Sequence, residues 1–402
     1  MGTPMGTDRL IRSVVDGGRE EGQESVMAER VYLDHAAGAP LLPAAHEAMA
    51  MAWAQPGNPS SLHTAGRTAR RLLEESRESL AASVGARAGE VVFTSGGTEA
   101  NNLFLLGAAG ARPERSRLVI GGGEHPSVAG VVERLPGRVD VLPLDADGRL
   151  VAGSESAIGP DTAAASTMLV NNETGVVQSL DAVRVRARET GAWLHTDAVQ
   201  AFGHLGLDFA ALDVDAMTVT AHKLGGPVGI GALVIRRELT LAAPGFGGGQ
   251  ERRVRSGTAM TALAAGFAAA AREAVAELTS ESARLAGLRK VLLRGITASV
   301  AEATVNGAEP VSPAILNVTF AGCRADDLLL ILDAAGIDCS TGSACTAGVH
   351  QPSEVLLAMG RSVDEASASL RFSLGRSSDA AAVERVLAVL PEAVDRARAA
   401  FR

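Results

Sequence analysis

Short apolar runs alternate with amphipathic, helix-like stretches from about residue 44 to residue 274. The runs are strand-sized and bounded by Gly, Asn or Asp, and several of them are separated by stretches with helical periodicity, such as 100–109 and 180–190. This alternation predicts an α/β domain with a mainly parallel sheet. The strand-sized runs are EVVFTS (90–95), RLVIGG (117–122), STMLVNN (166–172), AWLHTDA (192–198), AMTVTAH (216–222) and GALVIRR (231–237).

The pattern changes after this region. Residues 261–301 are Ala-rich with helical periodicity, which predicts one long helix leading into a smaller C-terminal unit. In that unit AILNVTF (314–320) and LRFSLG (370–375) are predicted strands, and 327–336 and 380–400 are predicted helices. The Gly-rich segment 245–253 is predicted to be a flexible surface loop.

Composition narrows the class of protein. The chain has 402 residues, 47% of them hydrophobic and 21% charged, as in a globular protein with more than one core-bearing unit. The net charge of −9 and the lack of a basic run beyond ERRVRS disfavour direct binding of nucleic acid. No apolar run reaches the roughly 18 to 20 residues that span a bilayer.

The N-terminus and the cysteines predict a location. The first 26 residues lack the apolar middle of a signal peptide, so the protein is predicted to be cytoplasmic. Residues 1–29 are predicted to form a disordered tail. The alternative is that residues 1–26 are a product of start-codon choice. Three widely spaced cysteines argue against a disulfide framework, and no Cys or His pair has the close spacing of a zinc site, so no metal is expected.

Lysine is rare in this chain, which otherwise uses arginine for positive charge. Of 37 basic residues only Lys223 and Lys290 are lysines, and Lys223 lies among small and apolar residues in TAHKLGGPVGIGALVI. A buried amine can lose its proton and attack a carbonyl, whereas a guanidinium stays protonated. Asp197 ends the preceding apolar run, and a carboxylate and a lysine at neighbouring strand ends are what pyridoxal phosphate requires. Taken singly, a snorkelling lysine and a helix-capping aspartate remain open.

Other polar residues fall at the ends of the predicted strands. In FTSGGTEANN, Gly97 and Thr98 lie in a Gly-rich turn that opens a helix, where backbone N–H groups can hold a phosphate. His125 follows the next run at the sheet edge where ligands bind in α/β folds. Asn172 and Gln200 could donate to a phenolate oxygen of the cofactor. Each signal is weak alone, because such turns and histidines are often structural.

Cys345 lies in TGSACTAGVH, among residues too small to pack a core. A slim, mobile arm would suit a thiol that must move between two partners. Cys339 alternates with Ile337 and is predicted to face a core, and Cys323 is predicted to lie in a turn.

Together these motifs resemble the cysteine desulfurases of the NifS/IscS type, which are class V aminotransferases of PLP fold-type I. The resemblance covers nearly everything from residue 31 to about 399, and the order of its motifs is specific. They are YLDHAAGAP, GNPSSLHTAGR, FTSGGTEANN, EHPSV, NNETGVVQ, HTDAVQAFGH, AHKLGGPVGIGAL, RSGT, GSACTAG and LRFSLGR.

The resemblance implies a fold with two domains. A large domain (44–275) with a mainly parallel seven-stranded sheet would bind the cofactor. A smaller α+β C-terminal domain, formed by 30–43 with 276–402, would carry the mobile catalytic loop. The long segment from Cys345 to Met359 is similar to the extended loop of the IscS-like group.

The resemblance also implies roles for individual residues. Lys223 would hold pyridoxal phosphate, and Cys345 would attack the sulfur of L-cysteine, leaving alanine and an enzyme persulfide for a protein acceptor in iron–sulfur cluster assembly or thio-modification. Around the cofactor ring, His125 would stack and transfer protons, Asp197 would pair with the ring nitrogen, and Asn172 and Gln200 would contact the ring hydroxyl. The cofactor phosphate would be bound by Gly97, Thr98, Thr220 and His222, and by Thr258 from the second subunit of a homodimer. Arg371 would bind the substrate carboxylate, with Asn172 beside it.

The chain departs from the family pattern near the expected substrate mouth. His35 stands where Asn is common, Gly38 and Ala39 where two threonines are common, and Val228 where Lys is common. These departures leave open a specialised desulfurase, a selenocysteine lyase or another PLP-dependent C–S lyase or aminotransferase. A non-enzymatic sulfur-transfer platform is a further alternative, which the intact set of Lys223, Asp197 and Arg371 argues against. His350 and His125 are candidates to help ionise Cys345.

Overall fold

The computed structural model describes residues 30–401 except 136, 243 and 343–350. The chain divides into two units, Met1–Arg30 and Val31–Arg402, and the first is described only at Arg30. The tail predicted at 1–29 and the arm that carries Cys345 therefore lie outside the described residues.

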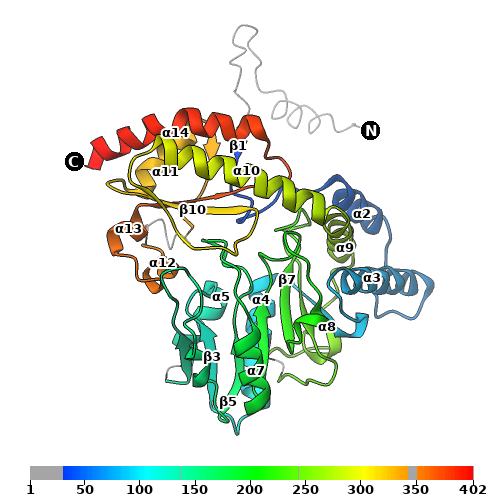
Figure 1. Cartoon of the computed structure of the whole chain (residues 1–402). Coiled ribbons are helices and arrows are strands. Elements are labelled where there is room, and N and C mark those ends of the chain that lie inside the picture. The colour runs from blue at the N-terminus through cyan, green and yellow to red at the C-terminus, as the bar shows by residue number, and fades with distance from the viewer. Residues whose placement is uncertain (1–29, 136, 243, 343–350, 402) are drawn as a thin grey trace, which may run out of the picture. The chain divides into compact units, whose positions relative to one another are not determined.

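A seven-stranded sheet forms the centre of the first two thirds of the chain, with strand order β2-β8-β7-β6-β5-β3-β4. Strand β8 runs antiparallel to both β7 and β2, whereas β7, β6, β5, β3 and β4 pair in parallel. The predicted mainly parallel sheet is therefore confirmed (Figure 1). The strands are β2 (Val91–Thr94), β3 (Arg117–Gly121), β4 (Val139–Leu142), β5 (Thr162–Ser166), β6 (Trp193–Asp197), β7 (Ala216–Thr220) and β8 (Gly231–Ile235).

Successive residues of a strand enter two different hydrophobic cores. On β7, Met217 and Val219 join one core with helix α7 (Asp181–Thr190), whereas Ala216 joins another with helix α4 (Gly97–Ala111). A strand buried on both faces reads as a continuous apolar run, which is why the sheet was visible in the sequence. The remaining helices of this region are α2 (Pro43–Trp53), α3 (Thr64–Ser83), α5 (Pro126–Ala129), α6 (Val131–Arg134) and α8 (Phe209–Leu212), with 3₁₀ turns η1 (Ala88–Glu90), η2 (Ser154–Ala157) and η3 (Glu251–Arg253).

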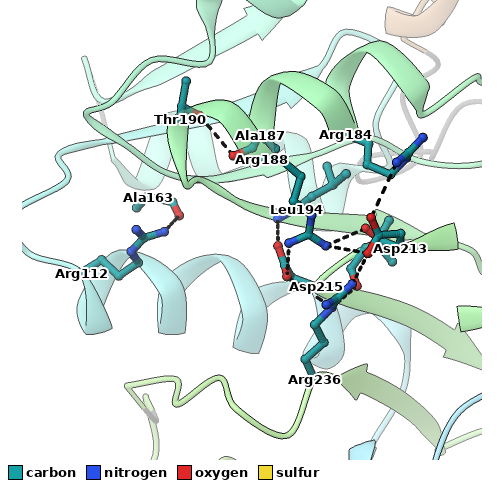
Figure 2. A network of polar contacts seen from close by, with 11 residues as sticks. Arg112, Ala163, Arg184, Ala187, Arg188, Thr190, Leu194, Asp213, Asp215 and Arg236 are labelled. Carbon is teal, nitrogen blue, oxygen red and sulfur yellow. Dashed lines mark hydrogen bonds and ion pairs between the residues drawn. The ribbon is translucent and has the colours of Figure 1, made fainter. Parts of the chain in front are cut away.

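An Asp–Arg network fixes the edge of the sheet where β7 begins (Figure 2). Asp215, directly before β7, accepts a hydrogen bond from Leu194 N on β6 at 2.8 Å and pairs with Arg188 at 3.2 Å and Arg236 at 3.4 Å. Asp213 also pairs with Arg188, at 3.0 Å. The network therefore ties three elements together at the edge opposite to the one where β6 and β7 end.

The C-terminal part has its own sheet and core. Val31 of β1 and the nearby Leu33 join this core, as do Leu292 of α10 (Leu278–Ser299) and Val386 of α14 (Ala380–Phe401). The domain boundaries at 44 and 275 stay a prediction. The elements are β1 (Val31–Tyr32) paired with β11 (Ile337–Asp338), the antiparallel order β12 (Ser369–Ser373), β10 (Ile315–Phe320), β9 (Ala303–Val305), and the helices α11 (Ala325–Ala334), α12 (Glu354–Ala358), α13 (Val363–Ser367) and α14 (Ala380–Phe401).

Two helical and loop predictions were wrong in detail. The single long helix at 261–301 is two helices, α9 (Thr261–Ala276) and α10 (Leu278–Ser299), because Glu277 leaves helical geometry at φ −99° and ψ 0°. The predicted flexible loop at 245–253 ends in the turn η3, where Glu251 makes a buried ion pair with Arg77 at 2.7 Å.

Two strand predictions also differ from the structure. The strand predicted at 166–172 lies at Thr162–Ser166, whose sequence TAAAS has only one of the β-branched residues that mark strands. The apolar residues after Ser166 belong instead to the loop that leads to the ligand edge. Strand β4 was missed because it is an edge strand with only Leu142 fully buried, so its sequence carries a weak apolar signal.

Among the described residues, no helix is both long and apolar enough to cross a membrane. The same residues contain no cluster of three or more His, Cys, Asp or Glu side chains placed to hold a metal ion.

Candidate active site

A cavity of about 320 Å³ opens where several strands of the large sheet end. Ten of the predicted site residues line it, and they come from six separate stretches of the sequence. Thr258 does not line this cavity and is exposed on its own chain, and Cys345 lies outside the described residues. The ten are Gly97, Thr98, His125, Asn172, Asp197, Gln200, Thr220, His222, Lys223 and Arg371.

Lys223 lies in the turn that follows β7, and backbone carbonyls hold its amine. Nζ donates to Ala36 O at 2.6 Å and to Ala37 O at 2.8 Å. Burial, followed by the charge of Arg371, lowers the pKa of Lys223 to about 8. A fraction of the amine is therefore neutral near pH 7, as a nucleophilic lysine requires.

Asp197 and His125 are joined through two residues that the sequence analysis did not single out. Asn101 Nδ2 donates to Asp197 Oδ2 at 2.7 Å and to Ser127 Oγ at 2.9 Å, and Ser127 Oγ lies 2.8 Å from His125 Nδ1. Asn101 is 1% exposed, on a helix otherwise rich in Ala and Leu. Asn101 precedes Phe104 and Leu105 by three and four positions, so it shares the apolar face of this helix, and this was the signal that could have revealed it.

The short helix α5 fixes the tautomer of His125. His125 caps this helix, and its Nδ1 accepts a hydrogen bond from Ser127 N at 3.1 Å, with Pro126 in the first helical position. Partial burial, and then Lys223, lower the pKa of His125, while Asp197 opposes them. The imidazole is therefore neutral near pH 7, with its proton on Nε2.

A second carboxyl group lies beneath the cavity floor. Glu124 is buried, and burial followed by the charge of Asp197 raises its pKa to about 8. Its Oε1 accepts from Met168 N at 2.6 Å, whereas Oε2 has no hydrogen-bond partner among the described residues. Glu124 is therefore mainly neutral near pH 7.

The first turn of α4 is suited to hold an anion. The helix begins at Gly97 after Gly96, whose φ of 158° is accessible to glycine, and its first N–H groups have no partner within the helix. A Cβ at Gly97 would lie 3.2 Å from Val199 Cγ2, so a larger residue would crowd the cavity wall. Gly97 and Thr98 thus present backbone donors at the positive end of a helix dipole.

Thr220 and His222 lie on the same side of the cavity and contact each other. Thr220 Oγ1 lies 3.1 Å from His222 Nδ1 and can also donate to Ile230 O at 3.1 Å. Burial, followed by Lys223, lowers the pKa of His222 to about 4, so the ring is neutral at pH 7. When Thr220 donates to Nδ1, the ring proton lies on Nε2 and can be donated to a ligand.

Arg371 lies on β12 and reaches the cavity from the C-terminal sheet. Its side chain is 5% exposed, and it donates from Nη1 to Asn172 O at 2.9 Å and from Nη2 to Asp34 Oδ1 at 2.6 Å. Asn171 holds the turn around Asn172, because its Oδ1 accepts from Glu173 N at 2.9 Å. Asp34 was not among the predicted site residues, although it lies in the motif YLDHAAGAP.

The departures from the family pattern mostly lie outside this cavity. Ala36 and Ala37 line it, whereas His35 and Ala39 line a second cavity of about 140 Å³ on another side of Lys223. Val228 is 80% exposed. Of the segment YLDHAAGAP, expected to line the substrate mouth, Ala36 and Ala37 thus line the cavity, whereas His35, Gly38 and Ala39 do not.

The two described cysteines are poor nucleophiles. Cys339 is buried after β11, and burial raises the pKa of its thiol to about 12. Cys323 is buried before α11, with Sγ 3.7 Å from Val394 O, and burial raises its pKa as well. Neither thiol forms a thiolate readily at neutral pH, so among the three cysteines Cys345 remains the candidate.

Known proteins are similar to this chain in sequence and in structure. The aminotransferase class-V family model matches residues 31–386. An IscS-like cysteine desulfurase of Mycobacterium tuberculosis is 49% identical over 382 residues, which cover 92% of this chain and 97% of that protein. A NifS-like protein has a TM-score of 0.85 at 30% identity, with 91% of this chain and 100% of that one covered. SspA, solved in complex with cysteine, has a TM-score of 0.75 at 33% identity, with coverages of 85% and 98%.

Proposed function

Because the chain belongs to the aminotransferase class-V family, and within it to the IscS-like cysteine desulfurases, we propose that it converts L-cysteine to L-alanine and carries the sulfur as a persulfide on Cys345. The enzymes of this family depend on pyridoxal phosphate. The observation that carries the proposal is the convergence of Lys223, Asp197 and Arg371 on one cavity, because no single structural role explains all three.

The residues of the cavity fit the cofactor. Lys223 offers an amine with a lowered pKa, and Asp197 offers a carboxylate anchored by Asn101. When bound, pyridoxal phosphate supplies an aldehyde carbon and a ring that accepts the electron pair released at the substrate Cα. Asp197 would pair with the ring nitrogen, and the first turn of α4 with Thr220 and His222 would hold the phosphate. His125 would lie against the ring, with Asn172 and Gln200 near its hydroxyl.

Proton transfer falls to Lys223 and His125. A lysine whose pKa is about 8 can both accept and return a proton near neutral pH, which suits removal of the substrate Cα proton and its return to carbon. Once its amine is free, Lys223 is held by the carbonyls of Ala36 and Ala37, so it stays beside the substrate. His125 carries its proton on Nε2 and can donate it.

Sulfur transfer conserves atoms and electrons. The Cys345 thiolate attacks the substrate Sγ, the Cβ–Sγ bond breaks, and its electron pair takes a proton at Cβ to complete the methyl group of alanine. The products are L-alanine and Cys345 persulfide, whose outer sulfur passes to a protein acceptor or is released as sulfide by an added thiol. The acceptor belongs to iron–sulfur cluster assembly or to a thio-modification pathway.

We also propose that the enzyme acts as a cytoplasmic homodimer. Thr258 is exposed and does not line the cavity of its own chain, as expected for a residue that serves the partner's phosphate site. Large apolar side chains are exposed on the same chain, including Trp53 at 65% and Leu62 at 86%. A partner subunit would cover such surface.

Product analysis tests the proposed activity. Purified protein loaded with pyridoxal phosphate should release alanine and sulfide in equal amounts from L-cysteine when dithiothreitol is present. Lys223→Ala should abolish both products. Formation of pyruvate and ammonia in place of alanine would show a lyase and refute the desulfurase assignment.

A further inference from the structure

Arg371 is held by a carboxylate of its own chain at the wall of the active-site cavity. Asp34 Oδ1 accepts from Nη2 at 2.6 Å, and Asn172 O accepts from Nη1 at 2.9 Å. Backbone hydrogen bonds between Arg371 and Ser340, at 2.6 and 3.1 Å, fix the strand beneath. The guanidinium is therefore oriented by contacts from three separate segments.

These contacts leave part of the guanidinium free. It has five N–H groups, and Asp34 and Asn172 engage one nitrogen each. Nε is buried and has no hydrogen-bond partner among the described residues, although Arg371 lines the cavity. Nη1 and Nη2 each keep a second N–H, and a guanidinium with unengaged N–H groups at a cavity wall favours an incoming acceptor such as a carboxylate.

Asp34 is the carboxylate best placed to hold Arg371. Glu173 lies near the same guanidinium, but its Oε2 accepts from Ser353 Oγ at 2.5 Å, and burial raises its pKa. Asp34 is itself fixed, because its carbonyl accepts from Ala37 N at 3.0 Å and Gly38 N at 3.3 Å.

We propose that Asp34 is the positioning residue for Arg371: it holds the guanidinium in the pose that receives the substrate carboxylate, without occupying the whole fork. The proposal rests on the proposed function in that it takes an α-amino acid as the ligand. A single oxygen contact to Nη2 orients the planar group, while the N–H groups that Asp34 and Asn172 do not engage remain for the ligand. The same segment, through Ala36 and Ala37, holds Lys223, so residues 34–37 align the two cationic groups of the site with each other.

Two ligands that differ only in the carboxylate test this role. L-alanine and ethylamine are titrated into the cofactor-loaded protein, and dissociation constants are read from the change in the visible absorption band. The wild type should bind L-alanine more tightly than ethylamine. Asp34→Ala should weaken L-alanine binding by about tenfold or more, as expected for losing a charge-assisted contact, and leave ethylamine within about twofold. Asp34→Asn keeps the oxygen acceptor and should lie between the two.

Two variants serve as controls. Arg371→Ala should remove the preference for L-alanine altogether. Asp140→Ala breaks another Asp–Arg pair, with Arg117 at the outer strands of the large sheet, and should change neither constant. Three results for Asp34→Ala would overturn the proposal. Tighter binding of L-alanine would show that Asp34 competes with the ligand, and equally weaker binding of both ligands would show a structural role. Unchanged binding of both ligands would show that Asp34 has no role in binding.

The outcome is separable from that of the desulfurase assignment. The titration uses neither a thiol nor sulfur transfer. The effect of Asp34→Ala on L-alanine binding can therefore be measured even in a protein that forms no alanine from L-cysteine. In a protein that does form alanine, Asp34→Ala should raise KM for L-cysteine about tenfold while kcat at saturation stays within about twofold. A fall in kcat with KM unchanged would also contradict positioning.

Discussion

The buried ion pair between Arg77 and Glu251 gives a sharp test of how the large sheet is held to its flanking elements. The two side chains are 10% and 4% exposed and meet in a bidentate pair, with both N–O distances 2.7 Å. Glu251 also accepts from Phe93 N at 2.8 Å, so it links α3, β2 and η3. Removing one partner leaves a buried charge, which typically costs about 3–5 kcal/mol.

Glu251→Ala should therefore lower the free energy of unfolding by about 3 kcal/mol. The lower end of the range applies because Arg77 keeps Val91 O and the half-exposed Glu74 as partners. Urea unfolding followed by circular dichroism measures the loss. Glu75→Ala breaks the exposed pair with Arg71 and is the matched control, with an expected change below about 1 kcal/mol.

The double variant Arg77→Met/Glu251→Leu tests whether the loss of stability comes from an unpaired buried charge. Removing both charges relieves the unpaired cation, so the double variant should recover at least half of the loss seen for Glu251→Ala. If Glu251→Ala unfolds within 1 kcal/mol of the wild type, or if the double variant is no more stable than the single one, the pair is not a buried electrostatic link.

Three further predictions concern the titrating groups and the hydrogen-bond chain of the cavity. Since the pKa of Lys223 is lowered to about 8, the rate at which the apoprotein captures pyridoxal phosphate, followed by absorbance, should rise from pH 6.5 to about 8 and then level off; a flat profile would contradict this. Since the pKa of Glu124 is raised to about 8, the native state binds its proton more tightly than the unfolded chain, and stability should fall as pH rises from about 4.5 to 8. Glu124→Gln should reduce that fall in thermal unfolding, and an unchanged pH dependence would count against a buried titrating Glu124. Asn101→Ala should lower kcat about tenfold with little change in KM, because Asp197 and His125 lose their common anchor; an unchanged kcat in steady-state kinetics would contradict this role.

Much of the fold could be predicted because its signals are local. Strands buried on both faces read as apolar runs, and Asp197 and His125 follow such runs directly. The break at Glu277 and the strand at Thr162–Ser166 were missed because Ala-rich sequence has no contrast between strand, helix and turn.

The residues missing from the predicted site act through contacts that are distant in sequence. Asp34 meets Arg371 across 337 positions, and Asn101 meets Asp197 across 96. Their partners are defined only once two sheets and a helix are assembled. A buried Asn in an apolar helix hints at a polar contact, but the sequence does not say with which residue.

Peptide mass analysis after a single exposure to L-cysteine tests the central claim most directly. The cofactor-loaded protein, mixed with L-cysteine without reductant and then digested, should carry one additional sulfur atom on the peptide that contains Cys345, with one alanine formed per persulfide. Cys345→Ala should bind L-cysteine but form no persulfide and no stoichiometric alanine. Alanine formation at the wild-type rate by Cys345→Ala, or extra sulfur on Cys323 or Cys339, would contradict the account.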